Sequence, residues 1–193
     1  MNYRYATSAE NPHLGGNLKE GDFNTHCPNV WSYLIDRFAV QSVLDLGSGL
    51  GYSSNFFHRK GCKTIAVDGL YDNAFDAVYP TVLHDLRNGP VITSVDLVHC
   101  QEVAEHIDEE FVGNLIGSLA CGKFVLMTHA LPGQLGHHHV NLQPPEYWIS
   151  LLEKAGLFVL PEDTNRVRQI AHDEGAIYVA QTGLVLANRF LSA

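Results

Sequence analysis

The stretch Val43-Leu44-Asp45-Leu46-Gly47-Ser48-Gly49-Leu50-Gly51-Tyr52-Ser53-Ser54 decides the fold of this chain. Its first residues are mostly apolar and predict a buried strand, its middle is a glycine-rich turn, and its end predicts the start of a helix. Glycine lets the backbone turn sharply and lets a ligand approach where a Cβ atom would clash. The first turn of the helix supplies free N–H groups beside that turn. The stretch therefore predicts a ligand-binding loop between a strand and a helix.

Short apolar runs recur along the chain and alternate with segments that predict helices. Runs of this kind are typical of strands buried on both faces of a sheet. Strands are expected at 42–46, 63–67, 82–83, 95–100, 124–128, 157–160 and near 183–187. Helices are expected at 28–39, 51–60, 108–119, 144–155 and somewhere within 164–175. The alternation predicts one α/β domain with parallel strands and right-handed crossovers.

The composition excludes several classes of protein. A chain of 193 residues suits one ordinary domain, and 46% hydrophobic with 17% charged residues argues against disorder. The 12 basic and 21 acidic residues give a net charge of −9. An acidic surface repels phosphate backbones and anionic lipids, so neither nucleic acid nor a membrane is an expected partner.

The compartment follows from the cysteines and the N-terminus. Four cysteines lie far apart without a CxxC pair, which is ordinary for the reducing cytosol. The N-terminal residues contain no apolar signal segment, and no window approaches 18 uninterrupted apolar residues. We expect a soluble, cytoplasmic protein with a small-molecule substrate, and an oligomer is compatible with the sequence.

The spacing of the glycines distinguishes between nucleotide cofactors. A dinucleotide-binding loop has the pattern GxGxxG, whereas here the glycines fall as GxGxG. Asp45 stands two residues before the first glycine, where a carboxylate is unfavourable near a pyrophosphate and suits a positively charged cofactor. Asp68 ends the next predicted strand and can accept hydrogen bonds from both hydroxyls of a ribose. A nicotinamide-dependent oxidoreductase is therefore disfavoured.

The segment Asp45-Leu46-Gly47-Ser48-Gly49-Leu50-Gly51 resembles the first motif of the class I S-adenosylmethionine-dependent methyltransferases, (Asp/Glu)-x-Gly-x-Gly-x-Gly. Glu102-Val103-Ala104-Glu105-His106 is similar to the Glu-Val-x-Glu-His segment of many small-molecule members. The likeness spans roughly residues 40–130. It implies a Rossmann-like, doubly wound, mostly parallel seven-stranded sheet with helices on both faces. It also implies S-adenosylmethionine as the methyl donor and S-adenosylhomocysteine as the product.

The same resemblance implies which residues bind the cofactor. The family often places an acidic residue after the third strand, against the adenine amino group, and Asp85 stands there. The implied cofactor-binding residues are Asp45, Gly47, Ser48, Gly49, Gly51, Asp68, Gly69, Asp85, Leu86, Gln101 and Glu102. Within the single domain 1–193 we expect an irregular arm at 1–23, a leading helix at 24–39, a cofactor-binding core at 40–130, a His-rich loop at 130–145 and C-terminal helices and strands at 144–193.

Histidines near the ends of strands are the candidates for acid–base chemistry. Open α/β sheets bind ligands at the carboxyl ends of their strands, and a hydroxyl acceptor needs a general base. The candidate catalytic residues are His106, His137 and His139, and the candidate substrate contacts are His129, His138, Asn141 and Trp148. Trp148 also has apolar neighbours at helical spacing, which fits a core position equally well.

The run His137-His138-His139 leaves alternatives open. In an extended segment the first and third imidazoles share one face. Together with Glu102 or Glu105 they would form a metal site. A base, a substrate contact or an exposed polar loop are the stronger interpretations, so no metal is predicted.

Two segments resemble bacterial and phage methyltransferase-domain proteins associated with glycan or other small-molecule modification: 21–28 and 139–149. The expected function is methyl transfer to an oxygen of a sugar or carboxylate-type metabolite. The alternatives are an inactive cofactor- or partner-binding module of the same fold and a metal-dependent variant built on the histidine loop. Enzymes that methylate amino groups of nucleic acids typically carry (Asp/Asn)-Pro-Pro-(Tyr/Phe) after the fourth strand, where His99-Cys100-Gln101-Glu102 stands here.

Overall fold

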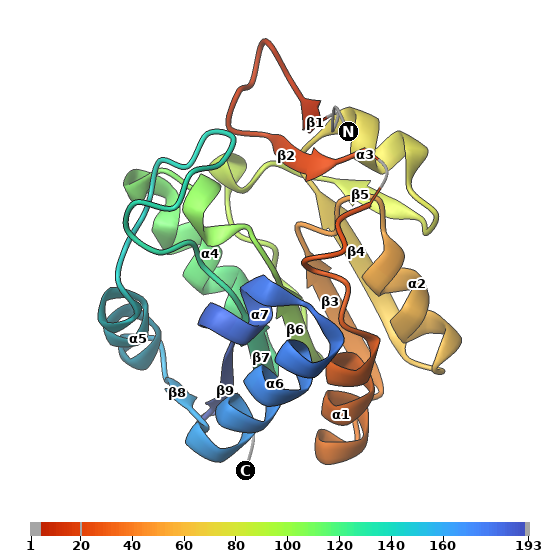
Figure 1. Cartoon of the computed structure of the whole chain (residues 1–193), viewed down its shortest axis with the longest axis vertical. Coiled ribbons are helices and arrows are strands. Elements are labelled where there is room, and N and C mark those ends of the chain that lie inside the picture. The colour runs from red at the N-terminus through yellow and green to blue at the C-terminus, as the bar shows by residue number, and fades with distance from the viewer. Residues whose placement is uncertain (1–4, 20, 192–193) are drawn as a thin grey trace.

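A computed structural model describes residues 5–19 and 21–191. Its main sheet has seven strands, as expected (Figure 1). In spatial order they are β5 (Thr81–Leu83), β4 (Lys63–Asp68), β3 (Ser42–Leu46), β6 (Val95–Cys100), β7 (Gly122–Met127), β9 (Leu184–Asn188) and β8 (Leu157–Val159). β9 runs antiparallel to both of its neighbours, and the other pairs are parallel. The predicted mostly parallel α/β sheet is confirmed.

Helices cover both faces of this sheet. One face packs against α1 (Pro28–Phe38), α2 (Tyr52–Arg59), α6 (Pro161–Glu174) and α7 (Ile177–Thr182). The other face packs against α4 (Val112–Leu119) and α5 (Pro145–Lys154). The short helix α3 (Tyr71–Asp76) follows β4. The sequence did not predict α3 and α7, because a helix of six residues is too short to show a period.

The central strands are mostly apolar on both faces because the two layers of helices pack against alternate side chains. In β3, Val43 belongs to the core beside α1, whereas Leu44 and Leu46 belong to the core beside α4 and α5. All three are at most 1% exposed. A strand buried in this way shows a continuous apolar run, which is why the sequence pattern located it.

The N-terminal arm is not irregular throughout, which corrects the expectation from sequence. β1 (Tyr5–Thr7) and β2 (Gly15–Leu18) form a two-stranded antiparallel sheet. Gly15 has φ +93°, and a Cβ atom there would clash with the backbone of Ala6. In Figure 1 this hairpin lies above the ends of β3 and β4. Its strands are three and four residues long and contain two glycines, so their pairing leaves no clear apolar pattern in the sequence.

Asp96, at the start of β6, ties β3 to β6 at the edge of the sheet opposite the glycine loop. Its carboxylate accepts hydrogen bonds from the backbone N–H groups of Gln41 and Ser42 (both 3.0 Å), and Lys123 Nζ lies 2.9 Å away. Partial burial alone would raise its pKa, but the hydrogen bonds, above all from Lys123, lower the pKa to about 2. A carboxyl group whose pKa is lower in the folded than in the unfolded protein stabilises the fold at every pH above its unfolded-state pKa. This stabilisation is lost as the pH falls through the folded-state pKa.

We therefore expect Asp96→Asn to lower the free energy of unfolding by about 1–2 kcal/mol at pH 7. The pKa shift alone would suggest more, but Lys123 is half exposed and solvent screens its interaction with Asp96. The difference from the unsubstituted protein shrinks as the pH falls from 4 towards 2. Urea unfolding at several pH values measures it, with the exposed Asp36→Asn as control. If the two proteins still differed by the full amount in their free energy of unfolding at about pH 2.5, close to the folded-state pKa of Asp96, this account would be contradicted.

Within the described residues, no helix has the length and apolar character needed to cross a membrane. The four cysteines are all buried as free thiols.

Candidate active site

A cavity of about 740 Å³ opens at the carboxyl ends of the parallel strands. The glycine loop, the N-terminal hairpin and the histidine loop after β7 surround it, as expected for an open α/β sheet. The predicted site residues that line it are Asp45, Gly47, Ser48, Gly49, Asp68, Gly69, Asp85, Leu86, Gln101, Glu102, His106, His137 and His139. The cavity therefore brings together 13 residues predicted from sequence.

The glycine loop holds a concave backbone that only glycine permits. Gly47 has φ +72°, and a Cβ atom there would clash with Val103. Gly49 has φ +54°, and the hydroxyl oxygen of Ser48 is buried on the cavity without a hydrogen-bond partner among the described residues. Gly51 does not line the cavity. Its left-handed backbone (φ +76°) ends the loop directly before α2, so its role is to shape the turn.

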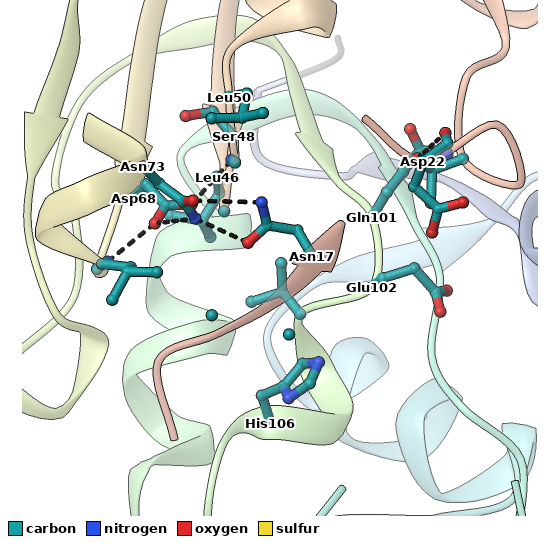
Figure 2. A pocket seen from close by; sticks show the side chains of 18 of the residues that line it. Asn17, Asp22, Leu46, Ser48, Leu50, Asp68, Asn73, Gln101, Glu102 and His106 are labelled. Atoms are coloured by element: carbon teal, nitrogen blue, oxygen red, sulfur yellow. Dashed lines mark hydrogen bonds between the residues drawn. The ribbon is translucent and has the colours of Figure 1, made fainter. Parts of the chain in front are cut away.

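Asp68, at the end of β4, organises the donor side of the cavity. Its carboxylate accepts hydrogen bonds from the backbone N–H of Gly49 (2.8 Å) and of Leu70 (2.9 Å) and from the amide of Asn73 (3.1 Å). Asn17 of β2 exchanges two hydrogen bonds with Asn73, so the hairpin reaches over this carboxylate (Figure 2). Burial raises the pKa of Asp68, although the three hydrogen bonds oppose that rise.

Asp45 lies behind the glycine loop in a buried network. One carboxylate oxygen is 2.7 Å from Nδ1 of His99, and the other accepts from the hydroxyls of Ser53 (2.6 Å) and Ser54. Trp31 donates its indole N–H to Nε2 of His99 (3.1 Å). An indole nitrogen only donates, so the proton of His99 is on Nδ1 and points at Asp45. Burial alone would raise the pKa of Asp45, but its hydrogen-bond partners outweigh burial and lower the pKa.

Asp45 is 1% exposed, and both of its carboxylate oxygens already have hydrogen-bond partners. The sequence predicts that Asp45 faces a positively charged cofactor, but in this arrangement its carboxylate has no oxygen free for direct contact with one. Its evident action is to hold β3, β6 and the start of α2 together beneath the loop.

Asp85 caps the turn after β5. One oxygen accepts from the backbone N–H of Arg87 (2.8 Å), and the other is 2.8 Å from Nε2 of His13 in the hairpin. Gly69 is also close to the hairpin, because a Cβ atom there would lie 2.5 Å from Leu14. The hairpin therefore closes over the part of the cavity where the resemblance places the adenine.

The other end of the cavity, here called the histidine end, contains Glu102, Glu105, His106, His137 and His139. Figure 2 shows Glu102 and His106 well apart from Asp68, on the other side of Asn17. Together with the donor side, this end makes the cavity bipartite.

Glu102 has a strained backbone, with φ +55°. Its N–H donates to the hydroxyl oxygen of Thr128 (2.7 Å), and that hydroxyl donates to the Glu102 carboxylate (2.8 Å). Burial raises the pKa of Glu102, and the bond from Thr128 opposes the rise. A non-glycine residue with positive φ at the end of a strand is typical of a functional site.

The histidine loop is fastened to the short helix η2 (Ala104–His106). The backbone N–H groups of Val140 (3.0 Å) and Asn141 (3.1 Å) both donate to the carbonyl oxygen of Glu105. The Asn141 amide donates to the carbonyl of Ile107 (3.1 Å). These bonds place the imidazole of His139 against that of His106, with ring centroids 5.1 Å apart at an angle of 82°.

Glu105 is the most deeply buried acid at this end, with 0% exposure. Neither of its carboxylate oxygens has a well-formed hydrogen bond within the described part of the chain. Burial raises the pKa of Glu105 well above its ordinary value, and the neighbouring Glu102 adds to the rise. Burial lowers the pKa of His106 to about 4, with contributions from His139 and His137.

Four predicted substrate contacts do not reach the cavity. Trp148 is 0% exposed and His129 1% exposed, and their rings pack at 6.2 Å inside the fold. The prediction that these two residues contact the substrate is therefore wrong. Trp148 lies on the face of α5 that packs against the sheet, which was the alternative that its helical spacing allowed.

Asn141 and His138, the other two predicted substrate contacts, do not line the cavity either. Asn141 is 2% exposed and fastens the histidine loop, so it acts on the loop and not on the substrate. His138 adopts a left-handed backbone (φ +48°) that turns it away from the cavity, while the residues on either side line it. His137 and His139 both line the cavity, although the segment is a turn and not the extended strand that the sequence argument assumed.

Trp148→Phe separates a core residue from a pocket residue. We expect the free energy of unfolding to fall by about 1–2 kcal/mol, since a smaller ring leaves part of a buried volume empty. The affinity for S-adenosylhomocysteine should stay within twofold, roughly the spread of a repeated measurement (about 0.4 kcal/mol). Chemical unfolding and calorimetric titration measure the two quantities. A large loss of affinity with unchanged stability would return Trp148 to the pocket.

Sequence reasoning missed several residues that shape the site: His13, Asn17, Trp31, Asn73 and His99. His99 was inside a quoted segment, but a single histidine in an apolar strand gives no sign of its partner. The others lie in segments without a motif. Glu105 lies in the Glu-Val-x-Glu-His segment, but the sequence does not show that it is the most deeply buried acid of the site.

Comparisons with known proteins support the fold and leave the activity open. No protein-family model matches the chain, and no curated protein sequence does. Solved structures do match. A S-adenosylmethionine-dependent methyltransferase from Archaeoglobus fulgidus aligns with 87% of this chain and 95% of its own, at 18% identity and a TM-score of 0.56.

Two further solved structures with this fold have different activities. Magnesium protoporphyrin IX methyltransferase from Synechocystis, solved with bound S-adenosylhomocysteine, aligns over 82% of this chain and 78% of its own at 14% identity and a TM-score of 0.58. The [4+2]-cyclase SpnF aligns over 83% of this chain and 81% of its own at 12% identity and a TM-score of 0.57. At these identities the likeness establishes the architecture alone.

Proposed function

We propose, from the class I methyltransferase fold that this chain has, that the protein transfers a methyl group from S-adenosylmethionine to an oxygen of a small molecule. The acceptor class is a sugar hydroxyl or a carboxylate-type metabolite. The observation that carries the proposal is the bipartite cavity, which joins the glycine loop and Asp68 to a group of carboxylates and imidazoles. A net charge of −9 favours a small acceptor over a nucleic acid.

The donor side fits an adenosine-type cofactor. Gly47 and Gly49 let a ligand approach the backbone, and the hydroxyl of Ser48, which has no hydrogen-bond partner in the described part of the chain, is available to it. Asp68 accepts three hydrogen bonds, and a carboxylate has about four acceptor positions, so it retains capacity for a ribose hydroxyl. If a ligand hydroxyl displaced the Asn73 amide from Asp68, a second acceptor position on the carboxylate would become free. When bound, S-adenosylmethionine supplies an electrophilic methyl group on a sulfonium.

The histidine end fits an oxygen acceptor. A hydroxyl loses its proton as its oxygen bonds to the methyl carbon and the methyl–sulfur bond breaks. His106, His137 and His139 line the cavity, and an imidazole of this group can take that proton. A carboxylate acceptor has no proton to lose and needs only orientation.

A second function is a cofactor-binding protein without methyl transfer. It is favoured by one observation, the likeness to SpnF, which is a [4+2]-cyclase and not named for methyl transfer. An acceptor screen distinguishes the two functions.

The experiment has two stages. Calorimetric titration with S-adenosylmethionine and S-adenosylhomocysteine tests the donor side, and micromolar dissociation constants, about −8 kcal/mol, are expected. A screen of sugars and carboxylic acids, read by release of S-adenosylhomocysteine, then tests the acceptor side. Binding without turnover of any acceptor would favour the second function, and absence of binding to either compound would overturn both.

A further inference from the structure

We propose that Glu105, His106 and His139 form a binding site for a divalent transition-metal ion at the histidine end of the cavity. One ligand atom from each of these residues lies within 4.8 Å of the other two. Ligand atoms about 2.1 Å from an ion are at most about 4.2 Å apart, so small side-chain rotations suffice to close the site.

The state of Glu105 is the independent observation. Its side chain is completely buried, and neither oxygen has a well-formed hydrogen bond from the described residues; its nearest polar neighbours are the carboxyl group of Glu102 and the backbone of Ala130. A buried carboxyl group in that position either keeps its proton or, once ionised, needs a nearby cation to offset the cost of burying its charge. The partially buried imidazoles supply no such charge when neutral. A divalent ion between the Glu105 carboxylate and the two imidazole rings would supply the positive charge that stabilises the ionised carboxylate.

The hydrogen bonds of His139 prepare it to act as a ligand. Its Nδ1 lies 3.2 Å from the carbonyl oxygen of Gln134 and must donate to it, which leaves the lone pair on Nε2. Metal-binding histidines characteristically donate their other N–H to a carbonyl or carboxylate in this way. The imidazole packs closely against Gly136, where a Cβ atom would clash with the ring, so the glycine permits this position of His139.

His106 offers an unused nitrogen at the same place. Its Nδ1 is buried and has no hydrogen-bond partner among the described residues. β2 covers the ring, since a Cβ atom at Gly16 would lie 3.1 Å from Cε1 of His106. The backbone bonds from Val140 and Asn141 to Glu105 hold the two histidine-bearing segments together. The ligand set is therefore built by the fold and not by chance proximity on a mobile surface.

The ligand chemistry selects the class of ion. Two imidazole nitrogens and one carboxylate oxygen suit Zn²⁺, Mn²⁺ or Fe²⁺ better than Mg²⁺, which prefers oxygen ligands. Three protein ligands leave at least one coordination position open. Under the proposed function, on which this step rests, an acceptor oxygen fills that position. His106 and His139 then act as ligands, and His137 remains as the imidazole that can take a proton.

The test measures ion binding directly. The full chain is stripped with a chelator, dialysed and titrated with Zn²⁺, Mn²⁺ and Mg²⁺ in separate calorimetric experiments. We expect one Zn²⁺ or Mn²⁺ per chain, Zn²⁺ the tighter of the two, and markedly weaker Mg²⁺. Metal analysis after dialysis against Zn²⁺ gives the stoichiometry independently.

Glu105→Gln and His139→Ala should each weaken Zn²⁺ binding roughly 100-fold or more, since loss of an outer hydrogen bond alone costs about 10- to 100-fold. The exposed Glu153→Gln and His172→Ala are matched controls and should bind like the unsubstituted chain. Thermal unfolding checks the fold of each variant, and His139→Ala, in a loop, decides if Glu105→Gln does not fold. Unchanged Zn²⁺ binding in both site variants, or no binding of Zn²⁺ and Mn²⁺, overturns the inference.

Titration of the same samples with S-adenosylhomocysteine separates this inference from the proposed function. Cofactor binding without ion binding refutes the ion site and leaves the function standing. Ion binding without cofactor binding does the opposite.

Discussion

We expect Asp68→Asn to weaken the binding of S-adenosylhomocysteine by at least tenfold and by about 100-fold if two ribose hydroxyls bond to the carboxylate. Charge-assisted hydrogen bonds contribute about 1.5 kcal/mol each, and two of them amount to about 3 kcal/mol. The carboxylate also accepts the N–H groups of Gly49 and Leu70, so it fixes the glycine loop relative to the end of β4. An amide side chain can accept at only one oxygen.

Calorimetry on Asp68→Asn measures this effect, and the exposed Asp76→Asn, eight positions later in α3, serves as control. Asparagine keeps the size of the side chain, so the variant should remain folded, as circular dichroism can verify. An affinity within twofold of the unsubstituted chain, less than about 0.5 kcal/mol, would show that Asp68 shapes the loop without touching the cofactor.

The largest effect on stability is expected for Asp45→Ala, about 3–5 kcal/mol of the free energy of unfolding. The substitution leaves the Nδ1–H of His99 and the hydroxyls of Ser53 and Ser54 without an acceptor in the interior. Buried donors without partners cost about 1–3 kcal/mol each, and partial rearrangement reduces their sum. Because the network joins β3, β6 and α2, its loss also loosens the glycine loop.

Urea unfolding of Asp45→Ala and of the double variant Asp45→Ala/His99→Leu tests the network. The double variant removes the Nδ1–H of His99 together with its acceptor, but it also removes the acceptor of the Trp31 indole N–H, so it should lose less stability than the two single variants added together. Asp36→Ala, on the exposed side of α1, should change the free energy of unfolding by less than about 0.5 kcal/mol. A double variant that loses more free energy of unfolding than Asp45→Ala and His99→Leu lose when added together would contradict the proposed coupling.

The positions of the central strands and of the glycine loop could be predicted because they are recorded locally. A strand covered on both faces must be apolar along its length, and a loop with three left-handed backbones, at Gly47, Gly49 and Gly51, must contain glycine there. The placement of Asp68 beside that loop also followed, since carboxyl ends of neighbouring parallel strands meet at one edge of the sheet.

Trp148 shows where a sequence pattern was ambiguous. Its apolar neighbours at helical spacing fitted a core residue, and its aromatic ring fitted a pocket wall. Only the packing of α5 on the sheet, where Trp148 meets His129, decided between them. No local pattern states which face of a helix borders a cavity.

The sequence by itself determined the α/β alternation, the glycine loop and the acidic residue that follows the next strand. The tertiary structure alone decided that a polar hairpin pairs over the cavity, that β9 runs antiparallel, that His99 bonds to Asp45 across 54 positions, and that His139 meets Glu105 and His106. The physical reason is the range of the interactions. Backbone conformation and periodic burial act on neighbouring residues and leave a pattern, whereas contacts between distant segments depend on how the whole chain packs.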